Sequence, residues 1–160
     1  MEKKEKTPKI FDEKTALEKI KNWCAYQERC QQEARNKLYE YGLWPEAVEN
    51  IISILISENF INEERFARIF AGGKFRIKKW GRVKIKLALK QKKITDYCIK
   101  KAMSEINEEE YISTLQKLIA IKSKQLKETS KIKKNFKLLQ YAYGKGYEQD
   151  IIGEILNREA

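Results

Sequence analysis

Apolar residues recur at three- and four-residue steps through most of the 160-residue chain. From Asp12 onward, Ala16, Ile20 and Cys24 follow this spacing, which is typical of an amphipathic helix. Similar stripes at 30–41, 48–56 and 66–70 predict further helices. Only 7 Gly and 2 Pro interrupt the chain, so breaks between helices should be short. The pattern predicts an all-α protein without a sheet.

Residues that favour the ends of helices lie at the boundaries of these apolar stripes. Gly42 can end a helix because glycine accepts a positive φ at no steric cost. Pro45 is tolerated in the first turn of the next helix. Asn62 is a suitable N-cap for the helix that carries Phe66. Cys30 is followed by Glu33 in capping-box position, although cysteine is a poor replacement for serine there.

The order of these features recurs along the chain. At an offset of 51 residues, Ala34, Leu38 and Leu43 correspond to Ile85, Leu89 and Ile94. The segment Asn107–Tyr111 repeats the pattern of Asn62–Phe66, and Gly146 parallels Gly42 at about twice the first offset. Amphipathic helices share some similarity by construction, but here caps, glycine turns and core positions agree in one register. We therefore predict three helical units of roughly 50 residues.

Such units bury their apolar faces against one another, which predicts an elongated, curved array. We expect one helical-repeat domain over residues 12–160, preceded by a flexible N-terminus at 1–11. The expected bounds of the three units are about 12–79, 80–129 and 130–160.

Positive charge is concentrated in two segments. The net charge is +11, and residues 74–93 hold ten Lys or Arg and no acidic residue. Residues 117–137 hold eight Lys against Glu128 alone. A basic helix face is often only solvated, yet charge of one sign at this density repels itself and attracts phosphates by releasing counterions. A polyanionic partner, above all nucleic acid, is therefore expected.

The first segment also contains two aromatic residues. Phe75 is expected to pack in the core, whereas Trp80, beside Gly81, could either pack or stack on a base. We expect Arg76, Lys79, Arg82 and Lys84 to be surface positions. The predicted binding residues for such a polyanionic partner are Lys74, Arg76, Lys78, Lys79, Trp80, Arg82, Lys84, Lys86, Lys90, Lys92 and Lys93. Candidate additional contacts are Arg65, Arg68, Lys122, Lys131, Lys133 and Lys134.

Other kinds of site find little support in the sequence. It has no His, which removes the commonest general base and metal ligand. Three scattered cysteines are too few for a structural zinc site, and the glycine-rich phosphate-binding motifs are missing. No apolar stretch is long enough to span a membrane. We predict no catalytic residue, no metal, no cofactor and no membrane partner, and a cytoplasmic protein with reduced thiols.

Four segments, in this order and spacing, resemble the RecX family of recombinase regulators from about Ala16 to Arg158. They are Glu33-x-x-x-Lys37-Leu38 ending at Gly42, Ile61-Asn-Glu-Glu-Arg65-Phe66-Ala67, Trp80-Gly-Arg-Val-Lys84-Ile85, and Gly146-Tyr147 before Ile151. Two positions depart from the family pattern. Lys93 stands where a Gly would parallel Gly42, and Cys30 stands where a Ser-type cap is usual.

The resemblance implies tandem three-helix repeats and a non-enzymatic regulator, and we expect it to be a monomer. It implies binding to RecA filaments on DNA and restraint of filament growth, ATP hydrolysis and strand exchange in DNA repair and recombination, as in the SOS response. Two alternatives stay open. A stand-alone DNA-binding protein with a helix–turn–helix-like basic face would bind DNA tightly without RecA, and an enzyme using Lys or carboxylates would show turnover.

Overall fold

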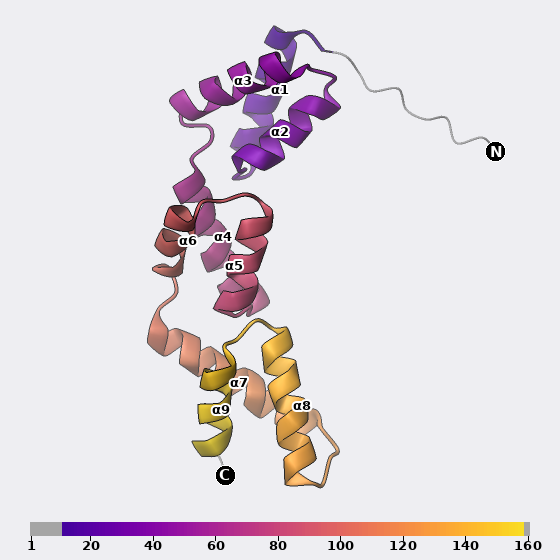
Figure 1. Ribbon diagram of the computed structural model, residues 1–160, viewed down its shortest axis with the longest axis vertical. Coiled ribbons are helices and arrows are strands. Elements are labelled where there is room, and N and C mark those ends of the chain that lie inside the picture. The colour runs from indigo at the N-terminus through magenta and orange to yellow at the C-terminus, as the bar shows by residue number, and fades with distance from the viewer. Residues whose placement is uncertain (1–10, 159–160) are drawn as a thin grey trace, which may run out of the picture. The chain divides into compact units, whose positions relative to one another are not determined.

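The computed structural model describes residues 11–158 and contains only helices in that range (Figure 1). The helices are α1 (Glu13–Tyr26), α2 (Gln31–Glu40), α3 (Pro45–Ser57), α4 (Glu63–Lys78), α5 (Arg82–Gln91), α6 (Asp96–Met103), α7 (Glu108–Gln125), α8 (Lys131–Gly144) and α9 (Gln149–Arg158). The predicted all-α fold of tandem three-helix units is confirmed. The flexible N-terminus expected at 1–11 lies outside the described residues, apart from Phe11, whose ring meets Tyr41 edge-on at 5.4 Å.

The helices form three successive groups, α1–α3, α4–α6 and α7–α9. The unit bounds expected from the sequence divide the same helices differently. They put α4 at the end of the first unit and α7 at the end of the second. Those bounds stay a prediction.

Side-chain caps fix the starts of several helices. The Asp12 carboxylate accepts the N–H of Thr15 at 2.7 Å, and the amide oxygen of Asn62 accepts the N–H of Arg65 at 2.9 Å. Asn107 caps α7 in the same way, at 3.0 Å from the nitrogen of Glu110. These bonds satisfy N–H groups that have no partner inside the helix.

The chain divides into two compact units, a first unit up to Phe66 and a second unit from Ala67. The first unit packs α1, α2 and α3 around a core that includes Ile20, Leu38, Val48 and Leu55, all fully buried. Most of the predicted stripes lie in the core. Ile56 is an exception at 44% exposed; it lies in the last turn of α3.

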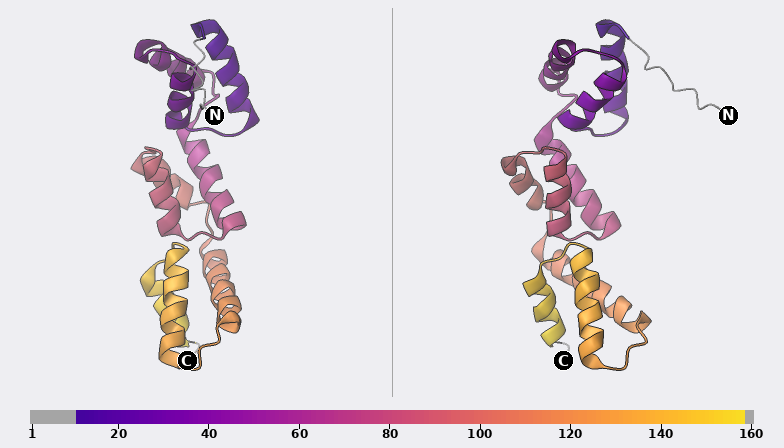
Figure 2. Two further views of the ribbon diagram at one scale, coloured as in Figure 1. Left: turned by 90° about the vertical axis from the view of Figure 1, so that its right-hand side faces the viewer. Right: turned by 45° about the vertical axis from the view of Figure 1, so that its right-hand side comes forward.

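The second unit contains most of α4 together with α5 to α9. In α7–α9, α8 packs against both α7 and α9 (Figure 2). The largest fully buried side chains of this unit are Tyr111 of α7 and Tyr147, which precedes α9. Their rings lie 5.0 Å apart, and Phe75 of α4 lies 5.8 Å from Tyr111. Phe75 is therefore a core residue, as predicted.

Candidate functional site

The basic segment 74–93 spans the end of α4, the turn after it, α5 and the next turn, all within the second unit. Its cations differ in exposure. Arg76, Lys78, Lys79, Lys86, Lys90 and Lys93 are exposed, whereas Lys74, Arg82, Lys84 and Lys92 are half-buried. The segment thus presents six exposed cations without an acidic residue among them.

Two aromatic rings hold half-buried lysines of this segment close together. The ammonium of Lys74 lies 4.9 Å from the ring centroid of Trp80 and 5.4 Å from that of Phe70. Lys84 lies 4.6 Å from the Trp80 ring, and Lys92 lies 5.9 Å from the Phe70 ring. Cation–π attraction of about 0.5–1 kcal/mol per exposed pair restrains these flexible side chains. These ammonium groups are therefore held close together before an anion binds.

Arg82 differs from the surface cation expected from the sequence. Its guanidinium binds Glu148 through Nη2 at 2.6 Å and through Nε at 2.9 Å. Nη1 binds Glu108 at 2.7 Å, and the group lies 4.1 Å from the Tyr111 ring centroid. Only 20% of the Arg82 side chain is exposed. The expectation of a surface position was wrong here, because two carboxylates from α7 and the α8–α9 turn enclose the guanidinium.

The turn between α4 and α5 forms a joint with the turn between α8 and α9. The N–H of Gly81 donates to the carbonyl of Lys145 at 2.8 Å, and that of Val83 donates to the carbonyl of Gly146 at 2.9 Å. The hydroxyl of Tyr147 donates to the carbonyl of Lys79 at 2.9 Å. A Cβ added to Gly81 would come closer than 3.0 Å to the Gly146 backbone.

Tyr111 completes this joint from α7. Its hydroxyl accepts the N–H of Arg82 at 3.0 Å and donates to the Glu148 carboxylate. Burial, with the nearby Glu148 carboxylate, raises the pKa of the Tyr111 phenol. The phenol therefore keeps its proton near neutral pH and remains a hydrogen-bond donor. The segment from Trp80 to Arg82, which carried much of the resemblance, thus also has a structural role.

A similar contact occurs in the first unit. The Glu63 carboxylate accepts the N–H of Gln31, the first residue of α2, at 2.7 Å. Arg65 binds Glu28 at 2.6 Å and the side-chain oxygen of Asn59 at 3.2 Å. In both units, a side chain at the start of the next three-helix group binds the first N–H of the preceding middle helix. The sequence revealed the Asn62–Phe66 and Asn107–Tyr111 segments, but not these partners.

The candidate additional contacts fall into two sets. Arg65 and Arg68 are half-buried and hold carboxylates, Arg68 by an ion pair with Glu105 at 3.0 Å. Lys122 and Lys134 are half-buried, whereas Lys131 and Lys133 are exposed. The ammonium of Lys122 lies 5.0 Å from the Tyr141 ring centroid. A binding role for all of these residues stays a prediction.

The cysteines are buried, free thiols. Burial raises the pKa of Cys24 to about 11 and that of Cys30 to about 12, so both stay protonated near pH 7 and pack as small apolar groups. The N–H of Cys30 donates to the Glu33 carboxylate at 3.1 Å, and the Cys30 side chain accepts the N–H of Glu33, so the predicted capping box is present. Within residues 11–158, no group of three His, Cys, Asp or Glu side chains could hold a metal ion. No helix in that range is long and apolar enough to cross a membrane.

Three-helix groups in series, with contacts from the next group to the first residue of α2 and of α5, define a tandem helical-repeat protein with one strongly basic segment. The family model described as "RecX, second three-helix domain" matches residues 62–103, which hold α4 to α6. Regulatory protein RecX of Thermotoga maritima is 30% identical over 137 residues, covering 83% of this chain and 77% of that protein. The chain belongs to the RecX family.

Other relatives are longer than this chain. Regulatory protein RecX of Clostridium acetobutylicum is 34% identical over 132 residues, covering 80% of this chain and 61% of the relative. The chain therefore spans less than two thirds of that protein's length. The crystal structure of RecX from Lactobacillus salivarius has the same fold, with a TM-score of 0.82 at 23% identity, covering 91% of this chain and 95% of that one.

Proposed function

We propose that the protein binds RecA recombinase filaments on DNA and restrains their growth, ATP hydrolysis and strand exchange. Membership of a family of regulatory proteins supports regulation as the role. The observation that carries the proposed mode of action is the basic segment 74–93, with six exposed cations and no acidic residue of its own. A DNA-containing filament presents a dense row of phosphates that these cations match.

The proposed action requires no catalytic residue. A protein that binds one state of an assembling filament better than another shifts the assembly equilibrium by its differential affinity alone. We propose that it acts in this way as a monomer, in the cytoplasm, without a cofactor. The exposed cations Arg76, Lys86 and Lys90 bind phosphate, whereas Arg82 holds the joint that keeps α5 in place.

The test compares two triple charge reversals in a RecA-catalysed, DNA-dependent ATPase assay. The first variant replaces the exposed residues Arg76, Lys86 and Lys90 by Glu. The control replaces exposed cations outside the segment, Lys14, Lys100 and Arg158, and so makes the same change in net charge. The wild type and the control should lower ATP hydrolysis at substoichiometric amounts, and the first variant should do so weakly or not at all.

The salt dependence of filament binding provides a second measurement. For every phosphate of a single strand that a variant no longer binds, the log–log slope should flatten by about 0.7. The proposal fails if wild-type protein leaves RecA activity unchanged, or if both triple variants regulate equally well. Tight, sequence-selective binding to DNA without RecA would instead support the stand-alone DNA-binding alternative.

A further inference from the structure

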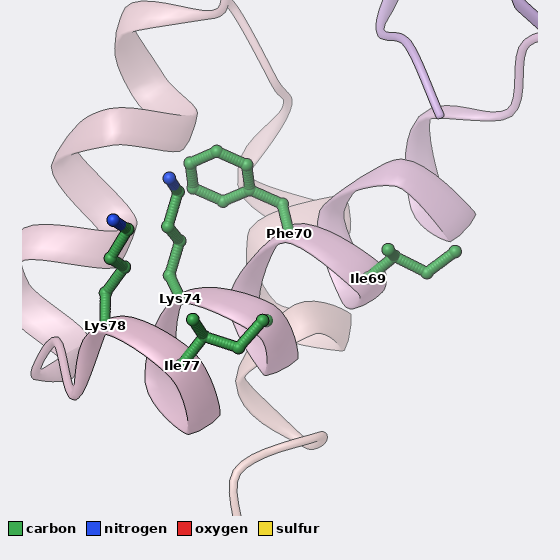
Figure 3. Close-up of a pocket in the computed structure, with 6 residues that line it drawn as sticks. Ile69, Phe70, Lys74, Ile77 and Lys78 are labelled. Atoms are coloured by element: carbon green, nitrogen blue, oxygen red, sulfur yellow. The ribbon is translucent and has the colours of Figure 1, made fainter. Parts of the chain in front are cut away.

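Helix α4 carries a shallow groove on the part that belongs to the second unit. The groove has a volume of about 220 Å³ and is lined by Ile69, Phe70, Gly73, Lys74, Ile77 and Lys78. Figure 3 shows Lys74 beside the Phe70 ring, with Ile69 and Ile77 two turns apart along the same helix. Ile69 is 53% exposed and Ile77 is 78% exposed. Two isoleucines four residues to either side of a glycine thus leave an open apolar strip.

Within residues 11–158, no neighbouring side chain or chain segment requires a glycine at position 73. A Cβ added there would meet no atom within 4 Å, in contrast to Gly81, whose missing side chain allows the close joint. Glycine inside a helix costs about 0.5–1 kcal/mol relative to alanine. The glycine instead leaves the backbone of α4 accessible between Ile69 and Ile77, so that a side chain from outside could enter.

The polar border of the groove indicates what would fill it. Lys74 and Lys78 lie along one edge, and among the described residues no carboxylate lies within ion-pair distance of either one. The ammonium of Lys74 instead lies over the aromatic rings of Phe70 and Trp80. The groove therefore matches a surface that is apolar in the middle and acidic at its edge. Nucleic acid matches the lysines, but its phosphates cannot cover two isoleucines.

We propose that this groove docks an acidic amphipathic helix of another protein, with one aliphatic side chain seated over Gly73 and carboxylates against Lys74 and Lys78. Helices that pack in this way follow rows of residues at three- and four-residue spacing. The strip from Ile69 to Ile77 is about 12 Å long at 1.5 Å per residue, so about two turns of a helix cover it and a peptide of about four turns extends past both ends. The docking site goes beyond the proposed function, since none of the three residues reversed in that test lines the groove.

The experiment uses full-length protein and a fluorescent synthetic peptide of about four helical turns. The peptide places Leu along one face and Glu elsewhere. A control peptide has the same composition in an order that scatters the Leu residues around the helix. Fluorescence anisotropy gives the affinity, and backbone amide NMR shifts locate the binding site. Only the first peptide should bind well, and the largest shifts should fall between Ile69 and Lys78.

Two variants close the groove without touching the core. Gly73→Leu fills its centre, and Ile77→Ser removes one apolar border. Each should weaken peptide binding by about tenfold, the cost of losing roughly 1.4 kcal/mol at the centre of an interface. The matched controls are Gly153→Leu in α9, where a Cβ also meets open space, and Ile121→Ser in α7, where the side chain is 57% exposed. Both controls should bind the peptide as the wild type does.

Equal binding of the two peptides would overturn the proposal, because charge alone would then explain the attraction. Unchanged affinity in folded Gly73→Leu or Ile77→Ser protein would also overturn it. A third contrary result is an oligodeoxythymidylate that shifts Ile69, Gly73 and Ile77 and competes with the peptide, which would assign the groove to nucleic acid. No step of this experiment contains RecA, so its failure and a failure of the proposed regulation are distinguishable.

Discussion

At the scale of single residues, Gly81 shows how one missing side chain allows a long-range contact. Its N–H reaches the Lys145 carbonyl only because the two turns approach backbone to backbone. Gly146, with a φ of 98°, needs glycine for a second reason, since other residues rarely adopt that conformation. Each glycine therefore leaves room for the other.

Gly81→Ala should destabilise the second unit. The added methyl group collides with the Gly146 backbone, which cannot rotate away as a side chain would, and overpacking of this kind costs about 1–3 kcal/mol. Gly73→Ala is the matched control and should raise the free energy of unfolding by about 0.5–1 kcal/mol. Urea unfolding followed by circular dichroism measures both. An unchanged midpoint for Gly81→Ala would show that the joint tolerates expansion.

The residue scale also marks a limit of sequence reasoning. Asn62 was predicted as a cap, and Asn107 lies in a segment predicted to repeat its pattern, because a cap needs only residues within one helical turn. The environment of Arg82 was not predictable. Its partners Glu108 and Glu148 lie 26 and 66 residues away, and their approach depends on how the three-helix groups pack. The basic segment 74–93 therefore contains both surface cations and one arginine with a structural role, and the sequence does not distinguish them.

At the scale of the helices, one turn recurs in all three groups. The residue that follows the C-cap of the middle helix has positive φ in each case, at Gly42 with 85°, Lys93 with 59° and Gly146 with 98°. The next residue is buried, and its N–H donates to a carbonyl five residues earlier. The pairs are Leu43 to Leu38 at 3.3 Å, Ile94 to Leu89 at 3.1 Å and Tyr147 to Ala142 at 3.2 Å. Lys93 departs from the glycine pattern in sequence but keeps the same turn.

Lys93→Gly should therefore stabilise the protein. A residue with a Cβ pays roughly 1–2 kcal/mol to hold this left-handed conformation, and glycine does not. We expect a gain of about 1 kcal/mol in the free energy of unfolding. Lys90→Gly, inside α5, should instead lose about 1 kcal/mol. Thermal and urea unfolding of the two variants test this contrast, and a loss of stability in Lys93→Gly would contradict it.

Helix periodicity was the most predictable element-scale feature, because apolar spacing and caps are local. The exceptions are apolar residues of the predicted stripes that are exposed to solvent. Ile69 was expected on the apolar stripe with Phe66 and Phe70, yet it is exposed and borders the groove on α4. A sequence stripe shows that a helix has an apolar face, but it does not show whether the chain itself covers that face.

At the scale of the whole molecule, the stability of the second unit depends on contacts between its two ends. The α4–α5 turn and the α8–α9 turn share backbone hydrogen bonds, and Glu148 joins Arg82 to Tyr111. The first unit has its own core and its own ion pair between Arg65 and Glu28. Each unit should therefore open as a separate cooperative block.

Glu148→Ala tests this division by hydrogen exchange. Loss of the carboxylate leaves the half-buried Arg82 and the Tyr111 hydroxyl without their shared partner, at a cost of about 1–3 kcal/mol. Exchange should speed up by roughly tenfold or more through α5 and α7–α9, since 1.4 kcal/mol corresponds to a factor of ten. The helices α1–α3 should keep their wild-type protection, because the partners of this carboxylate within residues 11–158, Arg82 and Tyr111, both belong to the second unit.

Glu28→Ala is the reciprocal control, since the two carboxylates are similarly exposed at 25% for Glu28 and 26% for Glu148. It removes the partner of Arg65 and should speed exchange in α1–α3 while α7–α9 stay protected. Faster exchange in every described helix of either variant would mean that the chain unfolds as one block. A change confined to α9 in Glu148→Ala would mean that the joint does not couple α5 to α7. The expected pattern, with each variant loosening only its own unit, follows from ion pairs that stay within one unit.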